Sequence, residues 1–272
     1  MYPGMRNDAV APKRPEDGRA ADENLKSLVK IARILECFST IDRTLSLGDI
    51  CERTELPKST THRLLASMKV VGLLDQDRER DRYRLGLKLF ELGNVVLANM
   101  DVHREARPFV EGLKRLSGHI VHLAVFDGRQ AVVIHRSDPS PEGSVPLNFI
   151  ESAPPHCTSV GKAILAFQTE TVLRRVTAMG LRRFTENTIT DPEKLQLELS
   201  KTRKRGYSVD DSEHQHGLRC VGAPIRDQSG RVFAAISVSG PGRRLRLEDV
   251  EDLSKMVMHH ANAISANLGY RP

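Results

Sequence analysis

The segment from Leu56 to Leu74 constrains the fold of this chain more than any other. Four of its apolar or small side chains recur at helical spacing, namely Thr61, Leu64, Leu65 and Met68. Positions i, i+3, i+4 and i+7 share one face of a helix, so we expect this face to pack inward. The segment also carries Lys58, Arg63 and Lys69 and no acidic residue. A cationic helix with hydroxyls on its exposed face is typical of a surface that contacts phosphates and base edges of DNA.

The outward-facing side chains of this helix, together with the hairpin that follows it, form the predicted DNA contact. On the helix these side chains are Lys58, Ser59, Thr60, His62, Arg63 and Ser67. Two short strand-like runs, at 70–74 and 83–85, enclose a charged turn. The arginines of this turn, which can reach the DNA backbone or the minor groove, are Arg78, Arg80 and Arg82. Docking to another protein is the alternative use of this face, because small helical modules with charged hairpins serve that purpose as well.

Two further helices complete the first domain. Ser46 followed by Asp49 is a capping pattern that opens a short helix. Pro57 suits the first turn of the DNA-contacting helix, because its missing N–H would be unpaired there. Upstream, an amphipathic helix is predicted from apolar residues at helical spacing, namely Leu28, Ile31, Ile34, Leu35 and Phe38. Three helices and a charged hairpin over residues 25–86 predict a winged helix-turn-helix domain.

The segments on either side of this domain differ sharply in composition. Residues 1–24 are rich in Pro, Gly, Ala and charged residues without apolar periodicity, and we expect a disordered arm. Residues 87–103 are predicted to form a linker helix. Nine of the fourteen residues from Leu87 to Met100 are apolar, which is more than one inward stripe requires. We therefore expect the second apolar face to meet another copy of the chain; a helix buried wholly within one chain is the alternative.

Residues 104–272 are predicted to form a mixed α/β domain. A helix over 104–116 precedes strand-like runs at 120–126 and 131–134, and Asp191-Pro192 opens a later helix that ends at Gly206. Strands at 207–209, 220–225 and 232–238 and a last helix from about Leu247 follow. There is no GxGxxG after a strand and no GxxxxGK[ST], so no nucleotide cofactor is expected. The N-terminus has no apolar signal core, no run approaches a membrane span, and the four cysteines form no CxxC pair, so we expect a cytoplasmic protein.

Residues 25–269 resemble the IclR family of bacterial transcriptional regulators in several separated motifs. The matching stretches include SLVKIARILECF, LPKSTTHRLL, YRLGLKLFELG, HCTSVGKAILA, NTITDPEKLQLEL, GYSVDDSEHQHGLRCVGAPI and AAISVSGP. The resemblance implies an α+β two-domain protein with an N-terminal winged helix-turn-helix, a linker helix and a C-terminal GAF-like α/β effector-binding domain. It also implies dimers, often paired into tetramers, on palindromic operators of catabolic genes.

The resemblance further implies where a small-molecule effector binds. The residues at the matching positions are Ser159, Val160, Asp210, Leu218, Cys220, Ser237 and Ser239. Backbone N–H groups at the helix start near Ser159 can hold an anionic oxygen, and alternate positions on one strand direct two serine hydroxyls to the same face. An ionised Asp210 would repel a ligand carboxylate, so we expect it to face a hydrogen-bond donor or to be protonated; a role as a turn or capping residue is the alternative. Phe149 and Ile150 favour an apolar wall and an aromatic or weakly charged effector.

Three other kinds of site compete with this interpretation. His156-Cys157 could supply a base and a thiolate, but side chains of adjacent residues diverge, so we do not expect an enzyme. The histidines at 119, 122 and 135 lie near predicted paired strands, but no carboxylate or thiolate completes a metal site. A regulator that senses oxidants through Cys157 and Cys220 is the alternative function.

Overall fold

The computed structural model describes residues 17–39, 41–77, 81–139 and 153–271, in two compact units divided between Gly93 and Asn94. Phe149 and Ile150, like residues 1–16, lie outside the described residues. Among the described helices, none is both long and apolar enough to cross a membrane. Because the two units are separate bodies, each is described by itself.

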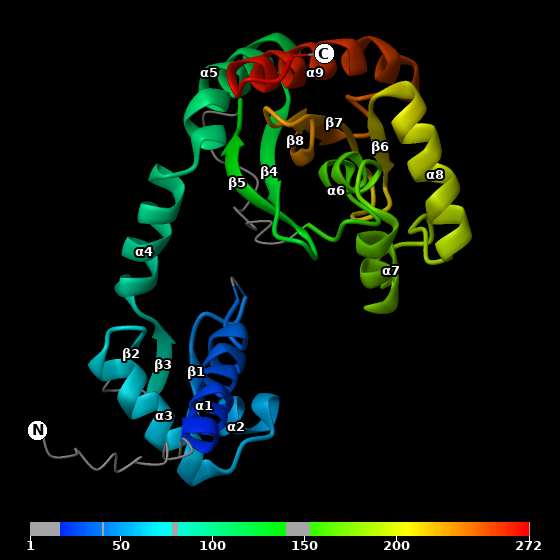
Figure 1. The fold of residues 1–272 in the computed structure, drawn as a ribbon. Coiled ribbons are helices and arrows are strands. Elements are labelled where there is room, and N and C mark those ends of the chain that lie inside the picture. The colour runs from blue at the N-terminus through cyan, green and yellow to red at the C-terminus, as the bar shows by residue number, and fades with distance from the viewer. Residues whose placement is uncertain (1–16, 40, 78–80, 140–152, 272) are drawn as a thin grey trace, which may run out of the picture. The chain divides into compact units, whose positions relative to one another are not determined.

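The first unit is the predicted winged helix-turn-helix (Figure 1). Its helices are α1 (Asp17–Glu36), α2 (Leu47–Thr54) and α3 (Lys58–Val70). Its strands β1 (Leu45–Ser46), β2 (Leu74–Asp77) and β3 (Arg82–Leu85) form an antiparallel sheet in the order β1-β3-β2. The three helices and the sheet bury one apolar cluster, in which Ile34, Ile50 and Leu65 are fully buried. This cluster fixes α3 against the rest of the unit.

Local sequence signals set the helix-turn-helix geometry as predicted. The Ser46 hydroxyl accepts a hydrogen bond from the Asp49 N–H, and the Asp49 carboxylate accepts one from the Ser46 N–H. This capping box begins α2, which ends at Glu55 in a left-handed conformation with φ of 57°. Pro57 takes the N-cap position of α3 and accepts the Thr61 N–H. The turn between the two helices is therefore encoded locally.

Three predictions for the first unit are wrong in detail. Helix α1 begins at Asp17, so residues 17–24 of the expected arm are helical, because the stretch after Gly18 has neither Gly nor Pro and is rich in Ala and charged helix formers. Leu28 is 63% exposed, because the buried stripe of α1 starts one turn later. The first hairpin strand begins at Leu74 rather than at residue 70, because α3 continues to Val70 and the chain turns at Gly72 with φ of 77°.

The linker helix is shorter than predicted. Helix α4 (Leu87–Ala98) ends where the Asn99 side-chain amide donates to the Val95 carbonyl, 2.9 Å away. Met100 is extended, and α5 (Asp101–Ser117) starts directly after it. Residues 101–103 therefore belong to the first helix of the second unit and not to the linker. No residue of α4 is buried, and Leu87, Phe90 and Val95 are 80%, 67% and 59% exposed.

The second unit is a five-stranded antiparallel sheet covered by helices on both faces (Figure 1). Its strands are β4 (Ile120–Phe126), β5 (Ala131–Ser137), β6 (Ser208–Asp211), β7 (Leu218–Arg226) and β8 (Val232–Pro241), in the order β5-β4-β8-β7-β6. Its other helices are α6 (Ser159–Leu165), α7 (Glu170–Ala178), α8 (Pro192–Arg205), the 3-10 turn η1 (Leu247–Asp249) and α9 (Val250–Asn267). The sequence analysis missed α7. Both ends of α8 are as predicted, with Asp191 as N-cap and Gly206 as C-cap.

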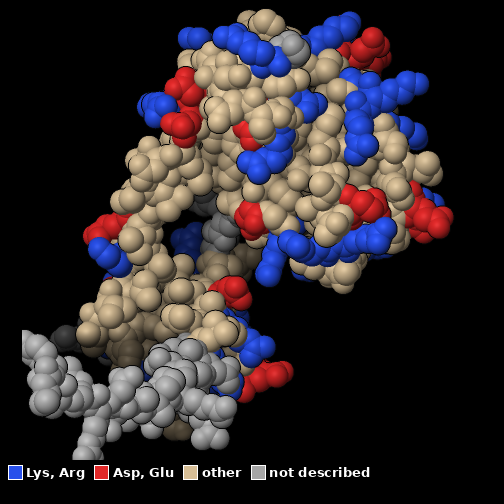
Figure 2. Space-filling view, in the orientation of Figure 1, with Lys and Arg blue, Asp and Glu red and all other residues tan. Residues whose placement is uncertain are grey.

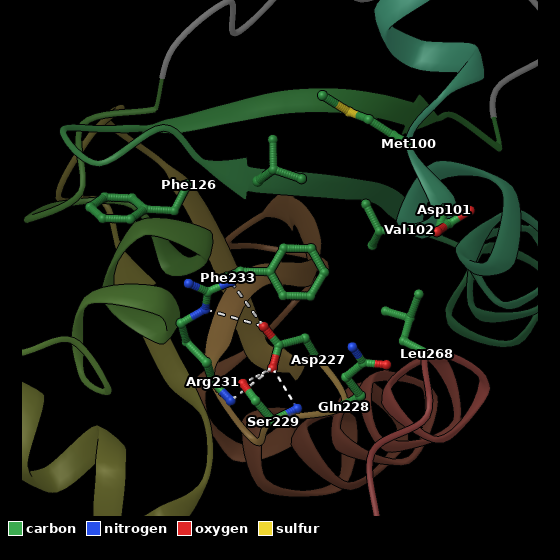
Figure 3. Close-up of a pocket in the computed structure, with 11 residues that line it drawn as sticks. Met100, Asp101, Val102, Phe126, Asp227, Gln228, Ser229, Arg231, Phe233 and Leu268 are labelled. Atoms are coloured by element: carbon green, nitrogen blue, oxygen red, sulfur yellow. Dashed lines mark hydrogen bonds and ion pairs between the residues drawn. The ribbon is translucent and has the colours of Figure 1, made fainter.

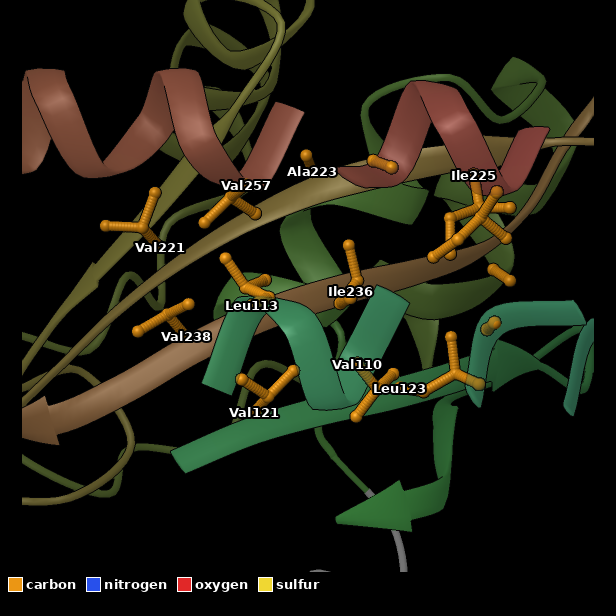
Figure 4. Close-up of a cluster of buried hydrophobic side chains, with 14 of the residues drawn as sticks. Val110, Leu113, Val121, Leu123, Val221, Ala223, Ile225, Ile236, Val238 and Val257 are labelled. Carbon is orange, nitrogen blue, oxygen red and sulfur yellow. The ribbon is translucent and has the colours of Figure 1, made fainter. Parts of the chain in front are cut away.

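Strand alternation gives the sheet one wholly apolar face and a second face that combines a smaller apolar cluster with polar side chains. Figure 4 shows the apolar face, where side chains such as Val121, Val221 and Val238 pack against α5 and α9. Each of these valines is fully buried. The residues between them along the same strands point to the opposite face, which α6 covers. The polar side chains of the candidate site lie on that second face.

Candidate functional site

Strand register brings three predicted effector residues side by side on the α6 face of the sheet. Asp210 on β6 pairs with Cys220 on β7, and Cys220 pairs with Ser239 on β8. Directly paired residues on neighbouring strands share a face, so the three side chains form a row across the sheet. The Cys220 side chain makes hydrogen-bonding contacts with both neighbours and with Ser159 of α6. Residues far apart in the sequence therefore converge at one polar spot.

A second row lies beside the first. Ser237, two residues before Ser239 on β8, pairs with His122 on β4. Its hydroxyl faces the same side as that of Ser239, as the sequence spacing predicted. The Ser239 hydroxyl lies 3.3 Å from His122 Nδ1. Burial lowers the pKa of His122 to about 4, with Arg136 contributing, so the imidazole is neutral at physiological pH.

Helix α6 sits unusually close to the sheet at this point. A Cβ on Gly222 would lie 2.9 Å from the carbonyl carbon and oxygen of Ser159, so only glycine allows the approach. The Ser208 hydroxyl donates to the same Ser159 carbonyl at 2.6 Å. These contacts seat the start of α6 on β6 and β7, above the two polar rows.

The space between α6 and the sheet is a narrow cavity with about 30 Å³ of free volume. All seven predicted effector residues line it, namely Ser159, Val160, Asp210, Leu218, Cys220, Ser237 and Ser239. The backbone N–H of Gly161, which was expected to help hold an anion, instead donates to the Thr158 hydroxyl at 3.2 Å. This N–H of the seven-residue helix is thus satisfied within the chain, and the polar side chains that line the cavity include the serines, Asp210, Thr158, His122 and His214.

Asp210 is a turn residue, which is one of the roles that the sequence left open, and its contact with an effector stays a prediction. Its carboxylate accepts the Glu213 backbone N–H at 2.8 Å, which makes it a turn residue, and it also lines the cavity. Burial raises the pKa of Asp210 to about 6, although that hydrogen bond and the Lys162 ammonium stabilise the ionised carboxylate and lower the pKa. Around this pH the carboxyl group therefore changes from an ionised acceptor to a protonated donor.

The sequence analysis missed two buried charged residues behind the cavity, Lys162 and Glu213. The Lys162 ammonium, on α6, forms an ion pair with Glu213 Oε1. The side chains are 1% and 10% exposed, respectively. Both residues belong to stretches that resemble the family, HCTSVGKAILA and GYSVDDSEHQHGLRCVGAPI, and neither was predicted to be buried. The signal available was the spacing of three between Asp210 and Glu213, which suits a side-chain-to-backbone turn.

The two cysteines considered for redox chemistry are buried. Burial raises the pKa of the Cys157 thiol, and it also raises that of Cys220, with the nearby Asp210 carboxylate contributing to both. Thiolate formation, on which oxidation and nucleophilic attack depend, is therefore disfavoured at both positions. His156 Nε2 lies 2.9 Å from the Arg182 carbonyl oxygen. These surroundings favour a structural role for both cysteines.

A larger groove of about 640 Å³ lies elsewhere in the second unit (Figure 3). Its apolar lining includes Met100, Phe126 and Phe233, and its polar rim includes Asp227 and Arg231. Those two rim residues form an ion pair with each other at 3.1 Å. Because these two charges already pair with each other, they offer a ligand no unpaired charged group. The smaller cavity is therefore the stronger candidate for an effector site.

The first unit presents the predicted DNA-contacting face of α3. Thr61, Leu65 and Met68 are buried, whereas Lys58, Ser59, His62, Arg63 and Ser67 are exposed and Thr60 is half-buried. Within the described part of the chain, Lys58 and Arg63 have no ion-pair partner. Ser67 donates its hydroxyl to the Arg63 carbonyl, 3.1 Å away. The face therefore keeps two unpaired cations at its surface.

In the wing, the Arg82 side chain is 41% exposed; its guanidinium donates to the Thr44 carbonyl at 2.9 Å and pairs with Asp49 at 3.5 Å, and its contact with DNA stays a prediction. The side chain ties the hairpin to the start of α2. Arg78 and Arg80 lie outside the described residues. On the visible face of the second unit, Lys and Arg side chains lie over most of the surface, with Asp and Glu side chains among them (Figure 2).

Known proteins resemble the chain in both units. A family model described as the IclR helix-turn-helix domain matches residues 27–78, and one described as the C-terminal domain of the bacterial transcriptional regulator IclR matches residues 94–266. The HTH-type transcriptional regulator KdgR of Escherichia coli K12 is 32% identical over 249 residues, covering 91% of this chain and 94% of that protein. The repressor AllR of Salmonella typhimurium is 34% identical over 264 residues, covering 96% and 97%.

A solved structure of similar fold contains a bound ligand. It is an IclR homolog from Microbacterium hydrocarbonoxydans complexed with 4-hydroxybenzoate. Its TM-score is 0.74 at 27% identity, over 89% of this chain and 98% of that chain.

Proposed function

Because the chain belongs to the IclR family of bacterial transcriptional regulators, we propose that it is a ligand-responsive regulator of catabolic genes. It is a regulator and not an enzyme, in keeping with its named relatives. The α3 face binds operator DNA, and the cavity between α6 and the sheet binds a small organic effector. The observation that carries the proposal is the convergence of seven separated residues on one cavity.

The DNA-binding surface consists of Lys58, Ser59, Thr60, His62, Arg63 and Ser67 on α3. The unpaired Lys58 and Arg63 supply the phosphate attraction, and the hydroxyls and the imidazole are available to base edges. Arg78 and Arg80, which lie outside the described residues, are further predicted contacts. Arg82, also a predicted contact, holds the wing against α2.

The effector carries an oxygen acceptor at one end and a hydrogen-bond donor near Asp210. Ser237 and Ser239 donate to the acceptor, and an ionised Asp210 accepts from the donor. A hydroxylated aromatic acid combines these features, as does the 4-hydroxybenzoate bound to the Microbacterium homolog. The free volume of about 30 Å³ is less than such a molecule needs, so binding must move α6 relative to the sheet. The effector therefore binds more tightly to the arrangement with α6 moved than to the arrangement without an effector, and this difference in affinity shifts the protein between the two.

The regulator binds a palindromic operator as a dimer, or as a tetramer of paired dimers. Helix α4 supports this proposal, because none of its residues is buried although most of them are apolar. A second copy would cover Leu87, Phe90 and Val95, and two subunits would then present two α3 helices to successive major grooves. Resetting the spacing of those helices would couple effector binding to DNA affinity.

A footprint on the DNA that flanks its gene tests the proposed function. We expect protection of two half-sites separated by about one helical turn. Candidate metabolites are then titrated into the complex with the wild-type chain and with Asp210→Asn. An effector that changes operator affinity of the wild type and binds the variant differently supports the cavity. If every binder has the same affinity for both proteins, Asp210 is not part of the effector site.

A further inference from the structure

Three charged groups lie together behind the effector cavity, and two of them are acidic. Lys162 pairs with Glu213 across the gap between α6 and the turn after β6. Asp210, 2% exposed, also lies within the electrostatic reach of the Lys162 ammonium. One buried cation thus serves two buried carboxylates.

With one ammonium and two carboxylates, the cluster has an uncompensated negative charge, which is costly in the protein interior. With both carboxylates ionised, the cluster carries a net charge of −1 away from water. An uncompensated buried charge is costly, and a carboxyl group avoids that cost by taking up a proton. The cluster is therefore expected to hold one proton between its two carboxyl groups around neutral pH.

A second observation supports proton sharing. Among the described residues, Glu213 Oε2 is a buried oxygen without a hydrogen-bond partner, although Oε1 is bonded to Lys162. A fully ionised carboxylate would leave that oxygen desolvated and unpaired. Burial also raises the pKa of Glu213 to about 7, and Lys162 opposes the rise.

The other titratable groups around the cluster do not remove the imbalance. The acidic neighbours are Asp211 on β6 and Glu198 on α8. The remaining neighbours are two cysteines, Cys157 before α6 and Cys220 on β7, and two histidines. His156 interacts electrostatically with Lys162, and His214 interacts electrostatically with His156. Burial lowers the pKa of both histidines, so neither supplies a second cation at neutral pH.

We infer that Lys162 and Glu213 are positioning residues that set the charge state of Asp210 and so decide which effectors the cavity accepts. This inference rests on the proposed function of the cavity. When the shared proton is absent or sits on Glu213, Asp210 is an ionised acceptor, and the cavity favours an effector that donates a hydrogen bond. When Asp210 itself carries a proton, it is neutral, and the cavity tolerates an anionic oxygen at the same place. The site thereby reads pH together with ligand chemistry.

The first test needs neither DNA nor effector. The full-length protein, labelled with carbon-13 at aspartate carboxyl groups, is titrated by NMR, and Asp210→Asn assigns the resonance. We expect a midpoint for Asp210 well above the usual aspartate value of about 3.9. Glu213→Gln removes the competing carboxylate, leaves Lys162 to Asp210 alone, and should lower that midpoint by at least about one pH unit. The control, Asp252→Asn, removes an exposed carboxylate on α9, which packs on the other face of the sheet, and should leave the midpoint almost unchanged.

A second arm measures the affinity of two probes, benzoate and phenol, below and above neutral pH. Benzoate is expected to bind more tightly at the lower pH and phenol at the higher pH, by up to about tenfold per pH unit for one linked proton. An Asp210 midpoint at the ordinary value, or one that Glu213→Gln leaves unchanged, would overturn the inference even if one variant folded poorly. If the titration behaves as expected but neither probe binds, the proposed aromatic effector fails and the shared proton stands.

Discussion

The close seat of α6 on β7 predicts the effect of Gly222→Ala. The added Cβ would lie 2.9 Å from the Ser159 carbonyl, which is backbone and cannot turn aside, so α6 must move away from the sheet. Overpacking of this kind costs about 1–3 kcal/mol, and loss of the 2.6 Å hydrogen bond from Ser208 to Ser159 costs about 1 kcal/mol more. Removing glycine from a strand returns about 0.5–1 kcal/mol. We therefore expect a net loss of roughly 1–3 kcal/mol.

Urea unfolding followed by far-ultraviolet circular dichroism measures this loss, and hydrogen exchange in β7 and β8 locates it in the second unit. The chain contains no tryptophan, so fluorescence is a weaker probe. Gly112→Ala is the matched control, because a Cβ at Gly112 in α5 meets only His260 Nε2, at an ordinary contact distance of 3.6 Å. That variant should be neutral or up to about 1 kcal/mol more stable, since alanine favours helices. If Gly222→Ala were as stable as the wild type, α6 would not be seated as described.

The remaining predictions concern the DNA face, the linker and the cavity histidine. Arg63→Ala should weaken operator binding by about 1–3 kcal/mol in a gel-shift titration without changing the melting temperature; unaltered binding would remove Arg63 from the interface. Phe90→Glu should halve the mass measured by light scattering, because it places a charge in the apolar face of α4; a wild-type chain that is already a monomer at micromolar concentration would end the dimer proposal. The free energy of unfolding should fall as the pH drops from about 6.5 to 4, because burial lowers the pKa of His122 to about 4 in the folded state. In this range the unfolded chain binds a proton at His122 that the folded protein does not. The contribution is up to about 3 kcal/mol, and it should be missing from a parallel acid titration of His122→Asn.

The residue types that line the effector cavity show how far a sequence can lead. The family resemblance placed Asp210, Cys220 and Ser239 in one site, and the strand register shows why, because each is paired directly with the next across three strands. Nothing in the sequence indicated that the Lys162 ammonium reaches this place. A lysine directly after a glycine in a short helix is ordinarily solvated, and only the packing of α6 onto the sheet buries it.

The sequence by itself determined the local elements whose signals are short-range. The Ser46–Asp49 cap, the alternating burial of α3 and both ends of α8 depend on contacts within a few residues, so periodicity and capping chemistry suffice to place them. Tertiary structure alone decided the anchoring of Arg82 and the pairing of Lys162 with Glu213. Both join residues that are 33 or more positions apart, and the energy of such a contact depends on burial and distance, which exist only once the chain has folded.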